Sequence, residues 1–146
     1  MSWGDMERQR PELAAFGAER LNGMVAYLAT TRGDGSPRVH PVTPIIGQGR
    51  LFVFMEPTSP KGHDLRRDAR YALHCAVGDS GGGGGEFHVA GRARLIADPA
   101  ARALAAGLSS YAPADRYILF ELDVERAAST VYAGDQTAHQ RWRLGE

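Results

Sequence analysis

Short apolar runs, each closed by a turn rich in glycine or proline, follow one another through most of this chain. Runs of about four to eight residues that favour β-branched and aromatic side chains are typical of β-strands. They fall at seven places, the last of them short: 24–31, 38–46, 50–55, 71–77, 86–96, 117–124 and 128–132. Because these runs dominate and are not regularly interleaved with helices, we predict a mainly β protein. Six or seven antiparallel strands in a barrel or sandwich fit better than a doubly wound parallel sheet.

Side-chain patterns within the runs predict which faces are buried. Residues 86–96 alternate, so one face of that strand is apolar and the other is polar. The apolar set is Phe87, Val89, Ala93 and Leu95, and the polar set is Glu86, His88, Arg92 and Arg94. Residues 50–55 are apolar through the body of the run, which predicts burial on both faces. Pro41 and Pro44 have no N–H for a sheet ladder and predict an edge strand or a bulge.

Three short helices are expected beside the strands. Each begins with a proline in its first turn, and they cover about 11–21, 60–68 and 99–108. Ser59 and Asp98 are suitable N-caps for the second and third helices. Gly23 is a suitable stop for the first. The chain then reads as one domain over residues 1–146, with a helical N-terminal extension over about residues 1–23.

Composition and charge exclude several classes of protein. The 17 basic and 17 acidic residues balance to zero net charge, whereas a general nucleic-acid binder usually has a strongly basic face. Cys75 is the only cysteine, so no internal disulfide can form, which fits a reducing cytoplasm. No segment has the pattern of a signal peptide or a membrane span, and the histidines show no close metal-ligand spacing. We therefore expect a cytoplasmic protein that binds no nucleic acid, membrane or metal.

The strongest candidate site is Thr58-Ser59-Pro60-Lys61, where a buried strand leads into a capped helix. The N–H groups and partial positive charge of a helix N-terminus favour phosphate, and a hydroxyl and a lysine add donors and a full charge. Lys61 is the only lysine of the chain. The alternative is structural, with Ser59 only capping the helix and Lys61 facing water. Arg38, with His40 on the same face of its strand, could reach a phosphate or face solvent.

Other motifs carry less chemistry. The loop Gly81–Gly85 leads into a strand rather than a helix and lacks a following Gly-Lys-Ser/Thr, so it is expected to be a hairpin connection rather than a phosphate loop. His74 and Cys75 are adjacent and point to opposite faces of a strand, which argues against a Cys-His catalytic pair. No Ser-His-Asp or G-x-S-x-G pattern indicates a hydrolase.

The order of these elements resembles the pyridoxamine 5′-phosphate oxidase-like family, the FMN-binding split barrels. The resemblance covers about residues 24–132. The segments that carry it are Leu28-Ala29-Thr30, Asp34 to Val42, Leu51 to Phe54, Ser59-Pro60-Lys61 followed by Leu65, Asp68 to Leu73, and Val89 to Ala93. It implies a six-stranded Greek-key split barrel that forms a homodimer, with FMN in a groove at the dimer interface.

The resemblance also implies roles for particular residues. Arg38 and Lys61 would contact the FMN phosphate, with Ser59 beside them. The backbone of Val39, His40, Pro41 and Val42 would line the flavin ring, Phe54 and Met55 would flank it, and Glu86 and His88 would come from the partner subunit.

The activity suggested by the resemblance is that of an FMN-dependent oxidoreductase with an unidentified substrate. Two features of the true pyridoxamine phosphate oxidases are missing: Thr43 replaces a basic residue, and the C-terminal Arg-x-His motif has only a loose counterpart in Trp142-Arg143. The same fold also allows a reductase that uses the deazaflavin F420, or a flavin-binding module without turnover. The sequence names no catalytic residue.

Overall fold

The computed structural model describes residues 2–145 and contains four helices and eight strands within that range. The helices are α1 (Trp3–Gln9), α2 (Pro11–Leu21), α3 (Pro60–Arg67) and α4 (Pro99–Leu108). The strands are β1 (Ala26–Thr31), β2 (Pro37–Val42), β3 (Ile45–Gly47), β4 (Arg50–Met55), β5 (Arg70–Cys75), β6 (Glu86–Ile96), β7 (Ile118–Ala133) and β8 (Gln136–Arg143).

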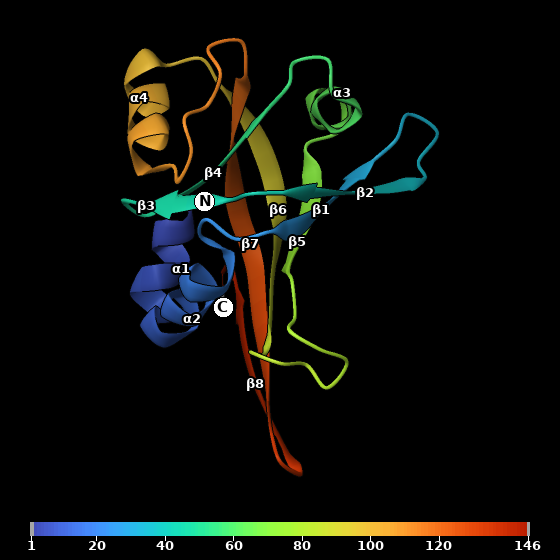
Figure 1. The fold of residues 1–146 in the computed structure, drawn as a ribbon, viewed down its shortest axis with the longest axis vertical. Coiled ribbons are helices and arrows are strands. Elements are labelled where there is room, and N and C mark those ends of the chain that lie inside the picture. The colour runs from blue at the N-terminus through green and yellow to red at the C-terminus, as the bar shows by residue number, and fades with distance from the viewer. Residues whose placement is uncertain (1, 146) are drawn as a thin grey trace.

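All eight strands belong to one strongly curved antiparallel sheet (Figure 1). The strand order is β2-β1-β5-β6-β7-β4-β3, and β8 pairs with β7 past the segment of β7 that pairs with β4. Within residues 2–145 the two edge strands β2 and β3 are not paired with each other. The sheet is therefore not closed, and the predicted split barrel is confirmed.

The observed strands differ from the expected ones in three places. Pro44 divides the run 38–46 into β2 and β3, because its backbone has no N–H to continue the ladder. The runs 117–124 and 128–132 form the single long strand β7, whose register against β6 shifts between Ala90 and Gly91. The polar tail, for which no strand was expected, contains β8. Pro41 does lie in an edge strand, as predicted.

β6 has the bounds predicted for it, and its alternation largely holds. Phe87 and Val89 are buried, whereas His88 and Arg92 are exposed. The expected burial of Leu95 was wrong, since 51% of this residue is exposed. The Gly81–Gly85 loop connects β5 to β6, as predicted for a hairpin connection.

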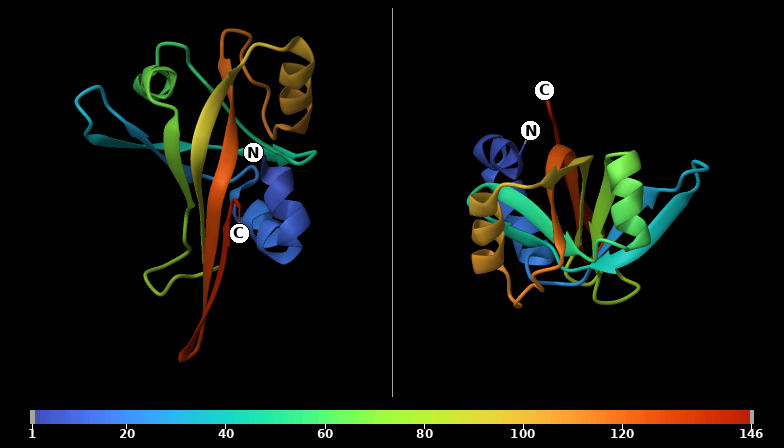
Figure 2. Two further views of the ribbon diagram at one scale, coloured as in Figure 1. Left: turned by 180° about the vertical axis from the view of Figure 1, so that it is seen from behind. Right: turned by 90° about the horizontal axis from the view of Figure 1, so that it is seen from above.

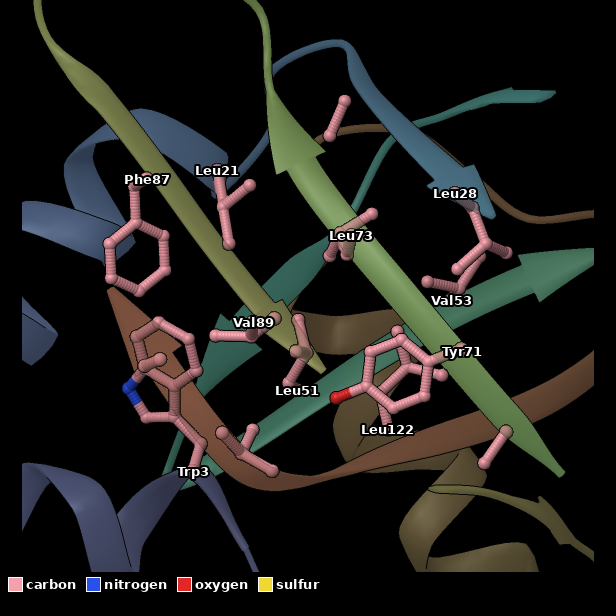
Figure 3. Packing of buried hydrophobic residues seen from close by; sticks show 14 of the residues in the cluster. Trp3, Leu21, Leu28, Leu51, Val53, Tyr71, Leu73, Phe87, Val89 and Leu122 are labelled. Atoms are coloured by element: carbon pink, nitrogen blue, oxygen red, sulfur yellow. The ribbon is translucent and has the colours of Figure 1, made fainter. Parts of the chain in front are cut away.

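The main core fills the concave side of the curved sheet and receives side chains from most strands (Figure 3). β4 is buried on both faces, as expected from its apolar body. Leu51, Val53 and Met55 enter this main core. Phe52 and Phe54 point the other way, into a second cluster that α4 covers. Cys75 is buried in the main core, which confirms its expected structural position.

The helices α1 and α2 pack together beside the sheet, away from α3 (Figures 1 and 2). Helix α1 lies inside the helical extension expected over about residues 1–23, although its segment is largely polar. Its Trp3 and Met6 are nonetheless fully buried. The Trp3 ring lies 5.9 Å from that of Phe87, measured between centroids. Among the described residues, no helix is long and apolar enough to cross a membrane.

Gly17 in α2 faces Phe87 so closely that a Cβ atom would lie 2.3 Å from the ring Cζ. We predict that Gly17→Ala lowers the free energy of unfolding by about 1–2 kcal/mol. Overpacking costs about 1–3 kcal/mol, and the better helix propensity of alanine returns at most about 1 kcal/mol. Urea denaturation would measure the difference.

Gly107→Ala in α4 is the matched control, because a Cβ atom there meets nothing within 4 Å. The alanine should stabilise the helix there by up to about 1 kcal/mol. Equal effects of the two substitutions would contradict the close packing of α2 on β6.

Candidate functional site

A hollow of about 300 Å³ lies where β4 ends and α3 begins. The end of β2 and the segment between α4 and β7 form its other walls. Its lining residues are Pro41, Val42, Thr43, Phe54, Met55, Glu56, Lys61, Tyr111 and Tyr117. Five of the residues expected at a cofactor site therefore lie together: Pro41, Val42, Phe54, Met55 and Lys61.

Ser59 forms the start of α3. Its hydroxyl accepts a hydrogen bond from the Gly62 N–H at 3.2 Å and donates one to the Glu56 carbonyl at 2.8 Å. The capping role expected for Ser59 is confirmed. Because the Ser59 hydroxyl already donates one hydrogen bond and accepts another, the unused N–H donors at this helix start are those of Lys61.

Lys61 is half-buried at the edge of the hollow. Burial lowers the pKa of its ammonium group, and the negative charge of Glu56 opposes that effect. Within residues 2–145, no carboxylate lies within ion-pair distance of Lys61, and its backbone N–H has no hydrogen-bond partner. Glu56 is held instead by Arg116, whose Nε lies 3.0 Å from its Oε1. Lys61 thus presents an unneutralised charge and a backbone donor to the hollow.

Arg38 lies on β2 beside α3 and is held by a buried carboxylate. Its Nε donates to Oδ2 of Asp64 at 2.7 Å, and the Asp64 side chain is only 3% exposed. The terminal nitrogens of Arg38 have no hydrogen-bond partner among the described residues. This ion pair uses one edge of the guanidinium and leaves the other available.

Asp64 was not predicted to contribute to the site, and it organises the face of α3 that meets β1 and β2. Thr30 Oγ1 donates to it at 2.8 Å, and Arg67 donates to its other oxygen at 2.9 Å. Burial alone would raise the pKa of Asp64, but the hydrogen bonds from Arg38, Thr30 and Arg67 outweigh it and hold this pKa below its usual value. An acidic residue five positions after the cap, on the helix face that carries Leu65, was the only sequence signal for it.

His40 lies two positions after Arg38 on β2, so the two side chains are on the same face of that strand. Burial lowers the pKa of its imidazole, and the positive charges of Lys61 and Arg38 lower it further. The three side chains therefore share one region of positive potential. Val39, by contrast, points outward from the sheet and is 65% exposed.

Glu86 and His88 lie apart from this region. A row of register partners runs across the sheet from β2 to β6. Pro41 pairs with Tyr27, Tyr27 pairs with His74, and His74 pairs with His88. Three strand spacings of about 4.8 Å separate Pro41 from His88 by roughly 14 Å. Within one protomer these two residues do not reach the hollow. Tyr111 and Tyr117 line it instead, and the sequence analysis did not identify them.

The family of this chain follows from comparison with known proteins. Residues 14–130 match the family model of pyridoxamine 5′-phosphate oxidase. The chain belongs to this family. A comparison with curated proteins finds no significant match. Within residues 2–145, no group of three or more histidine, cysteine, aspartate or glutamate side chains could hold a metal ion.

Solved structures with the same fold come from distant relatives. A heme binding protein from Mycobacterium smegmatis superposes with a TM-score of 0.67 at 20% identity, over 90% of this chain and 58% of that one. A NimC/NimA family protein from Clostridium acetobutylicum gives a TM-score of 0.63 at 16% identity, over 97% and 94% of the two chains. The heme storage protein HutZ from Vibrio cholerae gives 0.57 at 19% identity, over 80% and 89%. At these identities the likeness establishes the fold alone.

The hydrogen bonds to Asp64 predict a specific dependence of stability on pH. The lowered pKa of Asp64 means that the unfolded chain takes up this proton more readily than the folded one. The stabilisation is therefore complete above the unfolded pKa of about 4 and is lost as the pH falls through the folded pKa. Asp64→Asn should cost about 1.5–3 kcal/mol at pH 7, the range for a hydrogen bond to a charged group, and should flatten the acid limb.

Urea denaturation between pH 7 and pH 2 would measure both effects. Asp115→Asn is the control, because Asp115 is exposed and its side chain makes no hydrogen bond within the described residues. An Asp64→Asn variant with the wild-type acid limb would show that this carboxylate does not hold the site together.

Proposed function

We propose that this protein binds FMN, with the phosphate beside Lys61 and Arg38 and the flavin ring in the hollow next to Pro41. The observation that carries the proposal is that two incompletely paired cations belong to the surroundings of one capped helix. The ammonium group of Lys61 lies in the first turn of α3, and Arg38 is bonded through Nε to Asp64 of the same helix with its terminal nitrogens unused. Such an arrangement favours a phosphate dianion, because charge-assisted hydrogen bonds to phosphate are strong and helix starts attract anions.

The residues of the site suit the cofactor in charge as well as in position. Burial lowers the pKa of His40, and the positive potential of Lys61 and Arg38 lowers it further. A bound phosphate would relieve that potential. Asp64 fixes Arg38 from the buried side, so the guanidinium needs little further ordering to meet a ligand.

The rest of the hollow offers apolar and aromatic surface for a flat ring. Phe54 and Met55 form its floor and are mostly buried, whereas Tyr111 at the rim is 37% exposed. FMN bound there would supply the redox chemistry, and we propose that the protein is an FMN-dependent oxidoreductase. The chain's own contribution would be to bind and orient the cofactor and to shield one side of the ring from water.

We further propose that the working form is a homodimer. Glu86 and His88 are too far from the hollow to act within one protomer, and β1, β2 and β5 expose an outward face that includes Tyr27 and Val39. A second copy packed on this face would cover its apolar side chains and could bring its own Glu86 and His88 to the cofactor groove.

Lys61→Ala should weaken FMN binding by about tenfold to a hundredfold, as expected for the loss of a charged hydrogen bond to phosphate. Fluorescence titration of the cofactor-free protein would measure the affinity. Arg10→Ala is the control for net charge, because Arg10 is exposed and has no side-chain partner among the described residues.

The absorbance spectrum decides between cofactors. Parallel titrations with F420 and with hemin provide the comparison. Protein that gains no flavin spectrum, or that binds hemin at Lys61-independent sites far more tightly than FMN, would contradict the proposal. FMN binding with wild-type affinity in Lys61→Ala would remove the role assigned to Lys61.

The dimer makes a separate prediction about mass. Light scattering of the FMN-bound protein should give twice the mass of one 15.8 kDa chain. Tyr27→Glu should reduce the dimer fraction, because it would place a carboxylate on the apolar face. Glu12→Gln in α2 is the control on an exposed surface. A monomer that still binds FMN would contradict the shared groove while leaving the Lys61 site intact.

A further inference from the structure

A second hollow, of about 450 Å³, lies on the outward face of β6, β7 and β8. The strand registers arrange its side chains in a grid with Ala128 at the centre. His88 and Arg141 flank Ala128 on the neighbouring strands. The next outward positions on β7 are Arg126 and Thr130. The small alanine side chain leaves a depression, and longer polar side chains surround it.

The grid gathers positive charge. Arg126 is paired in register with Arg143, and Thr130 with His139. Side chains opposite one another on antiparallel strands have Cβ atoms about 4.5–5.5 Å apart, and like charges at that spacing destabilise the sheet. Glu86 is the one acidic residue of the grid. It accepts a hydrogen bond from the Tyr132 hydroxyl and lies 3.6 Å from His74 Nε2, away from the arginines.

The arginines of the grid also differ from most other arginines of residues 2–145 in their contacts. Most arginines there either pair with a carboxylate or donate to a backbone carbonyl. Within residues 2–145, the exceptions that make neither contact are Arg10, Arg126, Arg141 and Arg143. Three of these four therefore meet at one hollow, in a chain whose net charge is zero.

We propose that this hollow, the Ala128 pocket, binds the phosphate group of a small phosphomonoester. Three arginines line it from two strands, Arg126 on β7 and Arg141 and Arg143 on β8. A phosphate has three terminal oxygens and can accept from several directions, whereas a carboxylate has two oxygens in one plane. Thr130 and His139, whose Oγ1 and Nδ1 lie 3.1 Å apart, add polar groups at the rim.

Within one protomer this pocket is separate from the hollow beside Lys61, and His88 is the lining residue that it would share with a cofactor groove completed by a second copy. Pro41, Tyr27, His74, His88 and Ala128 form one row of register partners from the first hollow to the second. Four strand spacings of about 4.8 Å place Ala128 about 19 Å from Pro41. The inference does not rest on FMN binding, and it stands if the Lys61 site takes another cofactor.

Titration of the protein with phenyl phosphate tests the proposal. The binding is monitored through the ¹H–¹⁵N NMR signals of the arginine Nε–H groups. The signals of Arg126, Arg141 and Arg143 should move together and saturate. Benzoate carries the same ring on a carboxylate and should bind at least about tenfold more weakly, because it lacks the third oxygen and second charge. Linear shifts of all exposed arginines, or equal binding of the two compounds, would overturn the proposal.

Variants separate the two sites. Arg141→Gln and Arg126→Gln should each weaken phenyl phosphate binding by about tenfold or more, as for a lost charged hydrogen bond. Arg10→Gln removes the same charge elsewhere and should change nothing. Lys61→Ala should leave this binding intact while it weakens FMN. If Lys61→Ala abolishes phenyl phosphate binding and Arg141→Gln does not, the Ala128 pocket is not the site.

Discussion

Burial of β4 on both faces holds this structure together. Leu51, Val53 and Met55 complete the main core, and Phe52 and Phe54 anchor the cluster that α4 covers. β7 also contributes to both clusters, with Phe120 and Leu122 in the main core and Leu119 in the second, so the paired strands β4 and β7 together join them. The strand then ends at the hollow beside Lys61, so the best-packed element of the fold also positions the start of α3. A rigid support of this kind favours a preorganised site.

Buried carboxylates connect that packing to the arrangement of positive charge. Glu121 on β7 receives Arg50 from the neighbouring β4, and Asp64 on α3 receives Arg38 from β2. In both pairs the acid is 3% exposed and the arginine reaches it from the rim. An uncompensated charge at such depth would be costly, so each acid determines where its arginine lies. The arginines around Ala128 have no such acid, so their guanidinium groups are available to an external anion.

Much of the fold could be predicted, and the errors have physical causes. The bounds of β4 and β6 follow from their apolar and alternating patterns, and the cap at Ser59 follows from local chemistry. Strand β8 was missed because its segment carries few apolar residues, and the break that separates α1 from α2 within the expected helical extension was missed as well. Contacts between distant residues help to fix α1 and β8: Trp3 packs against Phe87, and the Trp142 indole donates to Gln9 at 2.8 Å, in addition to the pairing of β8 with β7. No local pattern reports contacts between residues so far apart.

The sequence by itself determined the class of fold, the edge position of β2 and the helix start that carries Lys61, since turns, prolines and caps act over a few residues. Only the tertiary structure decided which charges would be neutralised. Asp64 reaches Arg38 across 26 positions of the chain, and Arg126 meets Arg143 through strand pairing. Ion pairing depends on distances in space, which sequence separation does not reveal, so both hollows became visible only when the sheet was assembled.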